Sequence, residues 1–181
     1  MIKVYRVLPD VDNFQTVLVD DIGSVMKYRF DGTPIGDAWE PPKAYVQSST
    51  DERGDFWGCF SNPSIFAVTP ATAQIVVTFL DQSCETLPLD ADGQELFVCN
   101  VTCVVNCLDR QKSQHKKGIP HWIEQYVFHP NRFDNSLFKI PETRMSEVLC
   151  VVGIVAPGDD FKGTVEKHGL KGLRFKEIWS E

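Results

Sequence analysis

The sequence predicts an α+β fold in which a mainly antiparallel sheet and a few packed helices form a single compact domain. Segments rich in β-branched and aromatic residues outnumber the helical ones, and the two types do not alternate regularly along the chain. The 181 residues are within the usual size of one domain, and 43% hydrophobic residues are enough for a core. No linker or internal repeat divides the chain, so residues 1–181 are expected to form one unit.

The N-terminal part is predicted to be rich in loops. Charged and apolar residues alternate from Lys3 to Leu8, which predicts a strand. Residues 9–55 are polar and are interrupted by frequent glycines and prolines. Only short strands are expected there, at 26–30 and 44–46.

The clearest helix is expected from Thr69 to about Gln82 or Ser83. Thr69 suits the N-cap, and Pro70 suits the first helical position, where its missing N–H costs nothing. The predicted buried face carries Ile75, Val76, Phe79 and Leu80. A turn is expected after this helix, at Pro88.

A second helix is expected from Phe161 to about Lys167. Asp159 or Asp160 can cap its first turn, where a carboxylate also favours the positive end of the helix dipole. Gly169 suits the position after the helix, because glycine adopts a positive φ without penalty.

Further strands are predicted at 95–108, 126–128, 137–140, 148–152 and 173–177. In the first of these, Cys99, Cys103 and Cys107 follow one another at four-residue spacing. On a helix they would share a face and could bind one metal ion. On a strand they are about 13 Å apart, too far for zinc–sulfur bonds of about 2.3 Å. We therefore expect neither metal nor cofactor, and a reduced, buried core role for all six cysteines: Cys59, Cys84, Cys99, Cys103, Cys107 and Cys150.

Acidic residues are concentrated in the N-terminal half. The chain carries a net charge of −7, of which residues 1–93 contribute −8 and residues 94–181 contribute +1. An acidic field repels nucleic acid and attracts basic proteins, although it can also serve solubility alone. The candidate partner contacts on this acidic surface are Asp20, Asp21, Asp51 and Glu52.

Trp57 is a fifth candidate contact, because it follows an acidic pair and tryptophan is common in binding hot spots. Structural roles are expected for the residues before it. Gly54 is expected to make a turn, Asp55 to cap a short helix and Phe56 to fill the core. A core role is the alternative for Trp57 as well.

Several classes of function are not expected. The chain has no recognisable catalytic or nucleotide-binding motif, and its four histidines lie in separate segments, so we do not expect an enzyme. The basic run 108–117 could contact phosphate, but a solvated loop with Asp109 capping its turn is preferred, and no nucleic acid partner is expected. The chain start lacks the apolar core of an export signal, which predicts a cytoplasmic protein without membrane contact.

A set of short motifs follows in a defined order along residues 54–181. They are Gly54-Asp55-Phe56, Leu87-Pro88-Leu89, Asn100-Val101, Leu108-Asp109 with Ser113, Phe138-Lys139, Val165-Glu166, and Gly169-Leu170-Lys171-Gly172-Leu173-Arg174-Phe175 with Trp179. In this set the sequence resembles a family of bacterial immunity proteins encoded beside polymorphic toxins, including toxins delivered by type VI secretion. Apart from Val4-Tyr5-Arg6, residues 1–53 match the pattern poorly and are expected to be its variable, loop-rich part.

The resemblance implies a cytoplasmic antidote that binds and neutralises the C-terminal toxin domain of a cognate toxin without catalysing a reaction. The shared motifs are expected to be scaffold, with specificity in variable loops. An acidic surface would suit a toxin with a basic substrate cleft, such as a nuclease, whose active site it would cover or block. Two alternatives remain: an enzyme of unknown type that disarms the toxin or its product, and a general interaction or adaptor domain.

Overall fold

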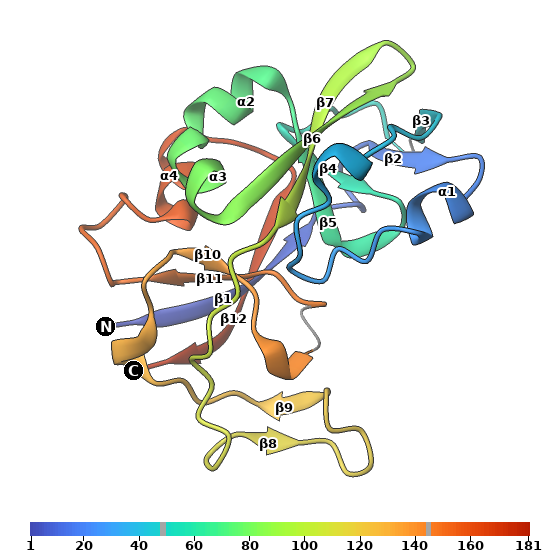
Figure 1. The fold of residues 1–181 in the computed structure, drawn as a ribbon. Coiled ribbons are helices and arrows are strands. Elements are labelled where there is room, and N and C mark those ends of the chain that lie inside the picture. Colours follow the sequence, from blue (N-terminus) through green and yellow to red (C-terminus); the bar gives the residue numbers. More distant parts are fainter. Residues whose placement is uncertain (48–49, 144–145) are drawn as a thin grey trace.

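A closed barrel and a four-stranded sheet make up most of the molecule (Figure 1). The structure, a computed structural model, describes residues 1–47, 50–143 and 146–181. These residues form one compact α+β domain in which most strand pairs are antiparallel, as the sequence predicts. The closure of one sheet into a barrel was not predicted.

Around the barrel the strands follow in the order β2 (Thr16–Val19), β3 (Ala44–Gln47), β6 (Cys84–Ala91), β7 (Gln94–Val101), β5 (Asn62–Val68) and β4 (Phe56–Cys59). The open sheet has the order β10 (Leu137–Phe138), β11 (Leu149–Val152), β1 (Lys3–Pro9) and β12 (Leu173–Ser180). A separate hairpin pairs β8 (Gln114–His115) with β9 (Ile123–Gln125). The α-helices of the described residues are α1 (Gly23–Met26), α2 (Pro70–Ile75), α3 (Val77–Ser83) and α4 (Phe161–Lys167). None of them, within the described ranges, has the length and apolar character that crossing a bilayer requires.

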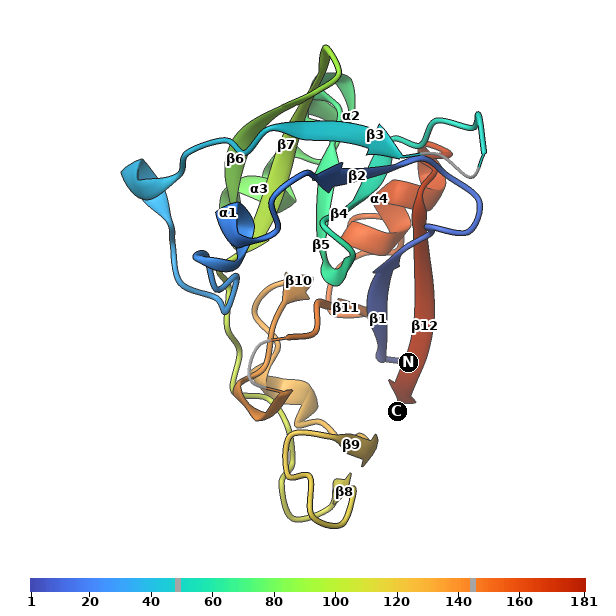
Figure 2. The ribbon, with the colours of Figure 1, turned by 90° about the vertical axis from the view of Figure 1, so that its right-hand side faces the viewer.

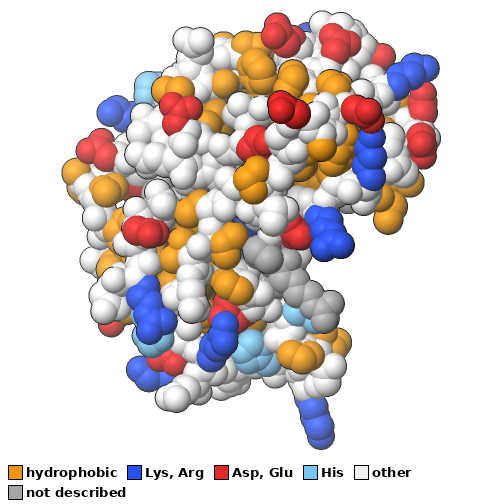
Figure 3. Space-filling model, in the orientation of Figure 1, with side chains coloured by type: hydrophobic (Ala, Val, Ile, Leu, Met, Phe, Trp, Pro, Cys, Tyr) orange, Lys and Arg blue, Asp and Glu red, His pale blue; other side chains and the backbone are white. Residues whose placement is uncertain are grey.

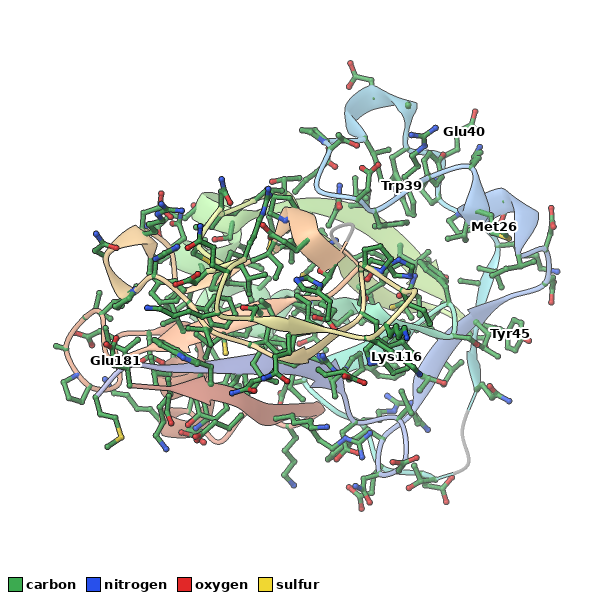
Figure 4. All side chains as sticks on the ribbon, turned by 90° about the horizontal axis from the view of Figure 1, so that it is seen from below. Met26, Trp39, Glu40, Tyr45, Lys116 and Glu181 are labelled. Atoms are coloured by element: carbon green, nitrogen blue, oxygen red, sulfur yellow. The ribbon has the colours of Figure 1, made fainter. Side chains whose placement is uncertain are left out.

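Apolar side chains from all six strands fill the barrel. Two of the junctions that close it are parallel: β2 pairs with β4, and β3 pairs with β6 through Ala44 and Ala91 alone. Trp39 covers the β6 edge that β3 leaves open, and its Nε1 donates to the Pro88 carbonyl at 2.9 Å. In the view from below, Trp39 lies between the segment that carries it and the barrel (Figure 4).

Pro88 lies in the middle of β6, so the turn expected at this residue is wrong. Pro88 stands opposite Phe97 of β7, and its carbonyl points outward to Trp39. The N–H and carbonyl of one strand residue point to the same side of the strand. An N–H at position 88 would therefore also point away from β7, and the pairing with β7 loses no hydrogen bond to the proline. The chain turns instead at Asp92 and Gly93, whose φ values of 53° and 81° suit a two-residue hairpin.

The helix expected after Thr69 is confirmed at both ends. Thr69 accepts a hydrogen bond from the Thr72 N–H at 3.2 Å, and Pro70 is the first helical residue. The helical segment ends at Ser83. Val76, with φ −102° and ψ 15°, divides it into α2 and α3.

The buried face of this helical segment differs from the expected face at Ile75, which is 40% exposed. The face is centred instead on Thr72, Val76 and Leu80, which follow one another at four-residue spacing and are all buried. Ile75 therefore lies at its margin.

The helix expected at 161–167 is confirmed as α4. Asp160, and not Asp159, is its cap, because the Asp160 carboxylate accepts from the Gly163 N–H at 2.7 Å. Gly169 follows with a φ of 63°. The helix packs its apolar face against the open sheet.

Two of the expected N-terminal strands are confirmed, 3–8 as β1 and 44–46 as β3. The strand expected at 26–30 is wrong. Gly23–Met26 form α1, and Phe30 then adopts a φ of 48° that no strand allows. This conformation leaves Phe30 buried among the apolar side chains of the barrel. Strand β2 was not predicted.

The strand expected at 95–108 is confirmed only as far as Val101, where β7 ends. Thr102 and Cys103 both donate their N–H groups to the Ser83 carbonyl, at 2.9 and 3.1 Å, which ends the pairing with β6. Beyond this point the chain makes two isolated bridges, Val104 with Lys139 and Leu108 with Phe128.

The later strands are found with altered limits. The segments 148–152 and 173–177 are confirmed as β11 and β12, and β12 continues to Ser180. The segment 137–140 is shortened to β10. The expected strand at 126–128 is wrong, because β9 lies just before it and only Phe128 forms a bridge.

The core role expected for the cysteines is confirmed. All six are free thiols, four of them are fully buried, and Cys84 and Cys103 are half-buried. Burial raises the pKa of Cys84 and of Cys107 to about 12. The thiols therefore pack as small apolar groups.

The barrel and the open sheet meet where Phe56 begins β4. A Cβ on Gly172, whose φ is 104°, would overlap with the Phe56 carbonyl, and a Cβ on Gly54 would lie 2.6 Å from the same oxygen. Asp55 accepts from the Lys171 N–H at 2.7 Å. The helix-cap role of Asp55 is therefore wrong, because a strand follows it, whereas the core role of Phe56 is confirmed by its 0% exposure.

Candidate partner-binding surfaces

Trp57 lies inside the barrel. It is the second residue of β4 and is 1% exposed. Successive side chains of a strand point to opposite faces, so Phe56 packs toward the open sheet and Trp57 packs into the barrel. The surface role expected for Trp57 is therefore wrong.

The four acidic candidates are exposed, but they form two separate pairs. Asp20 and Asp21 follow β2, whereas Asp51 and Glu52 lie between β3 and β4. β2 and β3 pair in antiparallel register as neighbouring strands of the barrel wall, and this pair is here called the β2–β3 ribbon (Figure 2). The two acidic pairs lie at its opposite ends, so the four-residue strands, roughly 10 Å long, separate them.

Local contacts orient these acids without burying them. Asp20 forms an exposed ion pair with Lys43 at 3.3 Å, and Asp21 accepts from the Gly23 N–H at 2.9 Å. The Glu52 carbonyl accepts from the Gln15 N–H at 3.0 Å. An exposed ion pair contributes only about 0–1 kcal/mol, so the carboxylates stay available to a partner.

The β8–β9 hairpin projects from the end of the molecule opposite the barrel (Figures 1 and 2). Its base is fastened by Ser113, whose Oγ donates to the Val127 carbonyl at 3.2 Å and accepts from the Val127 N–H at 3.0 Å. Ile123 and Tyr126 are buried in the cluster under the open sheet. The sequence predicts only a solvated loop here. Its turn cap is confirmed, since Asp109 accepts from the Lys112 N–H at 3.1 Å.

A polar network joins the hairpin base to β1. Tyr126 donates to Glu147 at 2.7 Å and accepts from Arg6 at 3.0 Å, and Arg6 forms an ion pair with Glu147 at 2.5 Å. Burial and the neighbouring Glu147 raise the pKa of Tyr126, so it remains a hydrogen-bond donor. The network therefore fixes the position of the hairpin base relative to the open sheet.

The tip of the hairpin, residues 116–122, combines cationic and aromatic side chains. It is closed by hydrogen bonds from the Lys116 N–H to the Trp122 carbonyl, at 2.8 Å, and from the Trp122 N–H to the Ile119 carbonyl, at 3.0 Å. Trp122 is 54% exposed, and the Lys116 Nζ lies 4.5 Å from its ring centroid. Lys117 and His121 are also exposed.

A cleft of about 660 Å³ separates the hairpin from the open sheet. Residues 121–124 and Tyr126 line its hairpin side, and 176–178 of β12 line the other, together with Arg6, Ser146 and Glu147. Lys176 forms no ion pair with any described residue.

Charge is divided between the two ends of the molecule. Residues 10–101, which contain the barrel, carry 15 acids and 4 bases and so −11, and the rest of the chain carries +4. Residues 110–125 alone carry 4 bases and 1 acid and so +3. On the face drawn in Figure 3, red side chains predominate over the barrel, and blue and pale-blue ones gather below.

Within the described residues, no group of three or more His, Cys, Asp or Glu side chains is placed to hold a metal ion. No model of a protein family matches this sequence, and no curated protein matches it.

Proposed function

We propose that the chain is an immunity protein that binds and neutralises a protein toxin in the cytoplasm. Two features support the proposal. The ordered motifs of residues 54–181 resemble such a family, and several of them serve the scaffold: Gly54, Asp55 and Phe56 meet Lys171 and Gly172 at the joint between barrel and sheet. Scaffold residues of this kind leave specificity to the exposed segments.

The observation that carries the proposal is the exposed acidic surface of the β2–β3 ribbon, in the part of the chain that lacks the family motifs. Asp20 and Asp21 at one end and Asp51 and Glu52 at the other would contact a basic substrate cleft from two sides. The charge of −11 over residues 10–101 would steer a basic toxin such as a nuclease toward this ribbon. The ribbon would then cover the cleft and exclude the substrate.

The proposal is tested with the toxin domain encoded beside this gene, by titrating its activity with the purified protein. Binding predicts full protection at one molecule per toxin and none far below that ratio. Protection at substoichiometric amounts would instead identify an enzyme, and no protection at any ratio would reject the toxin partner.

The interface is tested by reversing all four ribbon acids to lysine. We expect the association rate at low salt to fall by about tenfold or more, because steering depends on these charges. The matched control reverses four exposed acids away from the ribbon: Asp81, Asp134, Asp159 and Glu181. Equal losses in both variants would mean that net charge, and not the ribbon, governs association.

A further inference from the structure

The strands of the barrel wall are joined unevenly, and the seam between β3 and β6 is the weakest joint. β6 and β7 pair over eight residues each, whereas β3 pairs with β6 only through Ala44 and Ala91. One further hydrogen bond crosses the seam, from the Val46 N–H to the Asp92 carboxylate at 2.9 Å. Few backbone hydrogen bonds therefore resist separation of β3 from β6.

The joint on the other side of the β2–β3 ribbon is also short. Thr16 and Val17 of β2 pair with β4 in parallel register. The Phe60 N–H adds a hydrogen bond to the Val17 carbonyl at 2.8 Å. Two residue pairs on this side and one on the other thus attach the ribbon to the rest of the barrel.

Residues 21–42, here called the strap, join β2 to β3 and pass beside β6 (Figure 2). As far as residues 1–47, 50–143 and 146–181 show, every backbone-to-backbone hydrogen bond of the strap has both partners inside it. The strap is also braced by its own side chains. The Tyr28 hydroxyl donates to the Ala38 carbonyl and accepts from the Glu40 N–H, both at 2.8 Å. These contacts join its two arms, so the strap moves as one piece.

Four side chains anchor the strap to the other strands, in addition to the burial of its apolar residues in the barrel. Three anchors belong to distant segments, and the fourth is the indole of the strap itself. They are Lys139 to the Phe30 carbonyl at 2.5 Å, Asn100 to the Thr33 carbonyl at 3.0 Å, Glu85 to the N–H groups of Ile35 and Gly36, and Trp39 to the Pro88 carbonyl at 2.9 Å.

The Lys139 anchor is weakened by its surroundings. Lys139 is 1% exposed and forms no ion pair with any described residue. A buried cation without a counterion costs free energy, which returns when water reaches the ammonium group. Release of the strap would uncover Lys139, so the hydration of its charge favours the open form.

We infer that residues 16–47, which comprise the ribbon and the strap, separate from the barrel as one unit while the other strands stay folded. The seam between β3 and β6 opens, and the four anchors are released together. Once detached, two paired strands of four residues each are not stable alone, so the ribbon loses its own hydrogen bonds as well. Opening also parts Asp20 and Asp21 from the acidic pair at the other end of the ribbon. The inference concerns the free protein and does not rest on a toxin partner.

The test is hydrogen exchange of the full-length protein, read by mass spectrometry at several low concentrations of urea. The amides of residues 16–47 should exchange about tenfold or more faster than those of β6 and β7, after correction for intrinsic rates. They should share one dependence on urea, as a cooperative unit does. The amides of Ile35 and Gly36 report release of the Glu85 anchor directly.

Two variants separate this opening from global unfolding. Trp39→Phe keeps an aromatic ring but removes the indole N–H, so exchange of 16–47 should accelerate by about fivefold. Asp160→Ala is the control, because the cap of α4 stays intact when only the seam opens. It should accelerate exchange in β6 and β7, which requires global unfolding, by about fivefold and leave that of 16–47 unchanged. Circular dichroism confirms that both variants are folded.

Two results would overturn the inference. Equal exchange of 16–47 and of β6 and β7, with equal acceleration by Asp160→Ala, would mean that the barrel opens only by global unfolding. Rapid exchange of the strap alone, with β2 and β3 as slow as β6, would mean that the seam stays closed. Neither result bears on toxin protection, so the inference and the proposed function fail independently.

Discussion

Glu85 anchors residues 35–36, just before Trp39, which covers the part of β6 that β3 does not pair with. Its carboxylate accepts from the N–H groups of Ile35, at 2.8 Å, and Gly36, at 2.6 Å, and from the Asn100 amide at 3.0 Å. Burial acts to raise the pKa of Glu85, but the hydrogen bonds from Ile35, Asn100 and Gly36 outweigh it and hold this pKa below its usual value. The charged form of Glu85 is therefore the one that the fold stabilises.

Replacing Glu85 by Gln should lower the free energy of unfolding at pH 7 by about 1–3 kcal/mol, because one backbone donor then faces an amide N–H. A lowered pKa adds stability above the unfolded value of about 4.3, and this is lost as the pH falls through the folded value. The difference between wild type and variant should therefore shrink in acid. Urea unfolding at pH 7 and in acid measures the loss of stability at pH 7 and its decrease in acid. The control is the variant Glu95→Gln, at an exposed residue. Equal stability of wild type and variant at pH 7 would refute the role of Glu85.

Single residues also show how far local chemistry predicts structure. The caps Thr69 and Asp160 and the glycine Gly169 were predicted, because each acts on backbone groups within a few residues. Asp55 was not, because its partner, the Lys171 N–H, lies 116 residues away. No local pattern in the sequence records such a contact.

At the scale of elements, α4 provides a direct test of the helix cap. Replacing Asp160 by Ala should destabilise the protein by about 1 kcal/mol, because the Gly163 N–H loses its acceptor. For a chain of this size that is a fall of about 2–4 °C in Tm. Thermal unfolding measures it. The neighbouring variant Asp159→Ala should leave Tm nearly unchanged, and a larger effect of Asp159→Ala would mean that the cap is wrongly assigned.

Strands and hairpins were predicted less well than helices. Asp92-Gly93, between two apolar runs, is the strongest local signal for a hairpin, and the chain turns there and not at Pro88. β2 has only four residues, too few for a clear alternation. The β8–β9 hairpin has strands of two and three residues, so its projection depends on Ser113 and Tyr126 and not on strand pattern.

At the scale of the whole molecule, the buried thiols predict how stability depends on pH. Burial raises the pKa of every cysteine, to about 12 for Cys84 and Cys107. A raised pKa gives stability that is complete below the unfolded value, about 8.5, and is lost as the pH rises toward the folded value. Lys139 acts in the opposite direction, because burial lowers its pKa to about 8, but it is one group against six.

Unfolding in urea with a reductant present should therefore show stability falling steeply above about pH 8.5. Each thiol contributes up to about 1.4 kcal/mol per pH unit. Replacing Cys150 by Ala should reduce the slope by about that amount. Val151→Ala makes a comparable cavity at a buried neighbour without removing a thiol, so its slope should equal that of the wild type. An unchanged slope in the Cys150 variant would contradict this account.

The candidate site shows the same division between local and long-range information. The sequence located the exposed acids, because charged residues in a polar, glycine-rich stretch remain in water. It did not show that the β2–β3 ribbon holds them about 10 Å apart, nor that Trp57 is buried while Trp122 is exposed. Both tryptophans have polar and apolar neighbours in the sequence, so their burial depends on which strands close around them.

By itself the sequence determined the α+β class, the limits of the two helical segments at 69–83 and 161–167, and the core role of the cysteines. These features follow from capping, periodicity and apolar content, which act over a few residues. Only the tertiary structure decided the closure of the barrel, the joint at Phe56 and Gly172, and the two charged ends. The physical reason is that these depend on contacts between distant segments, such as the pairing of β2 with β4 and of β3 with β6, which leave no pattern in either segment alone.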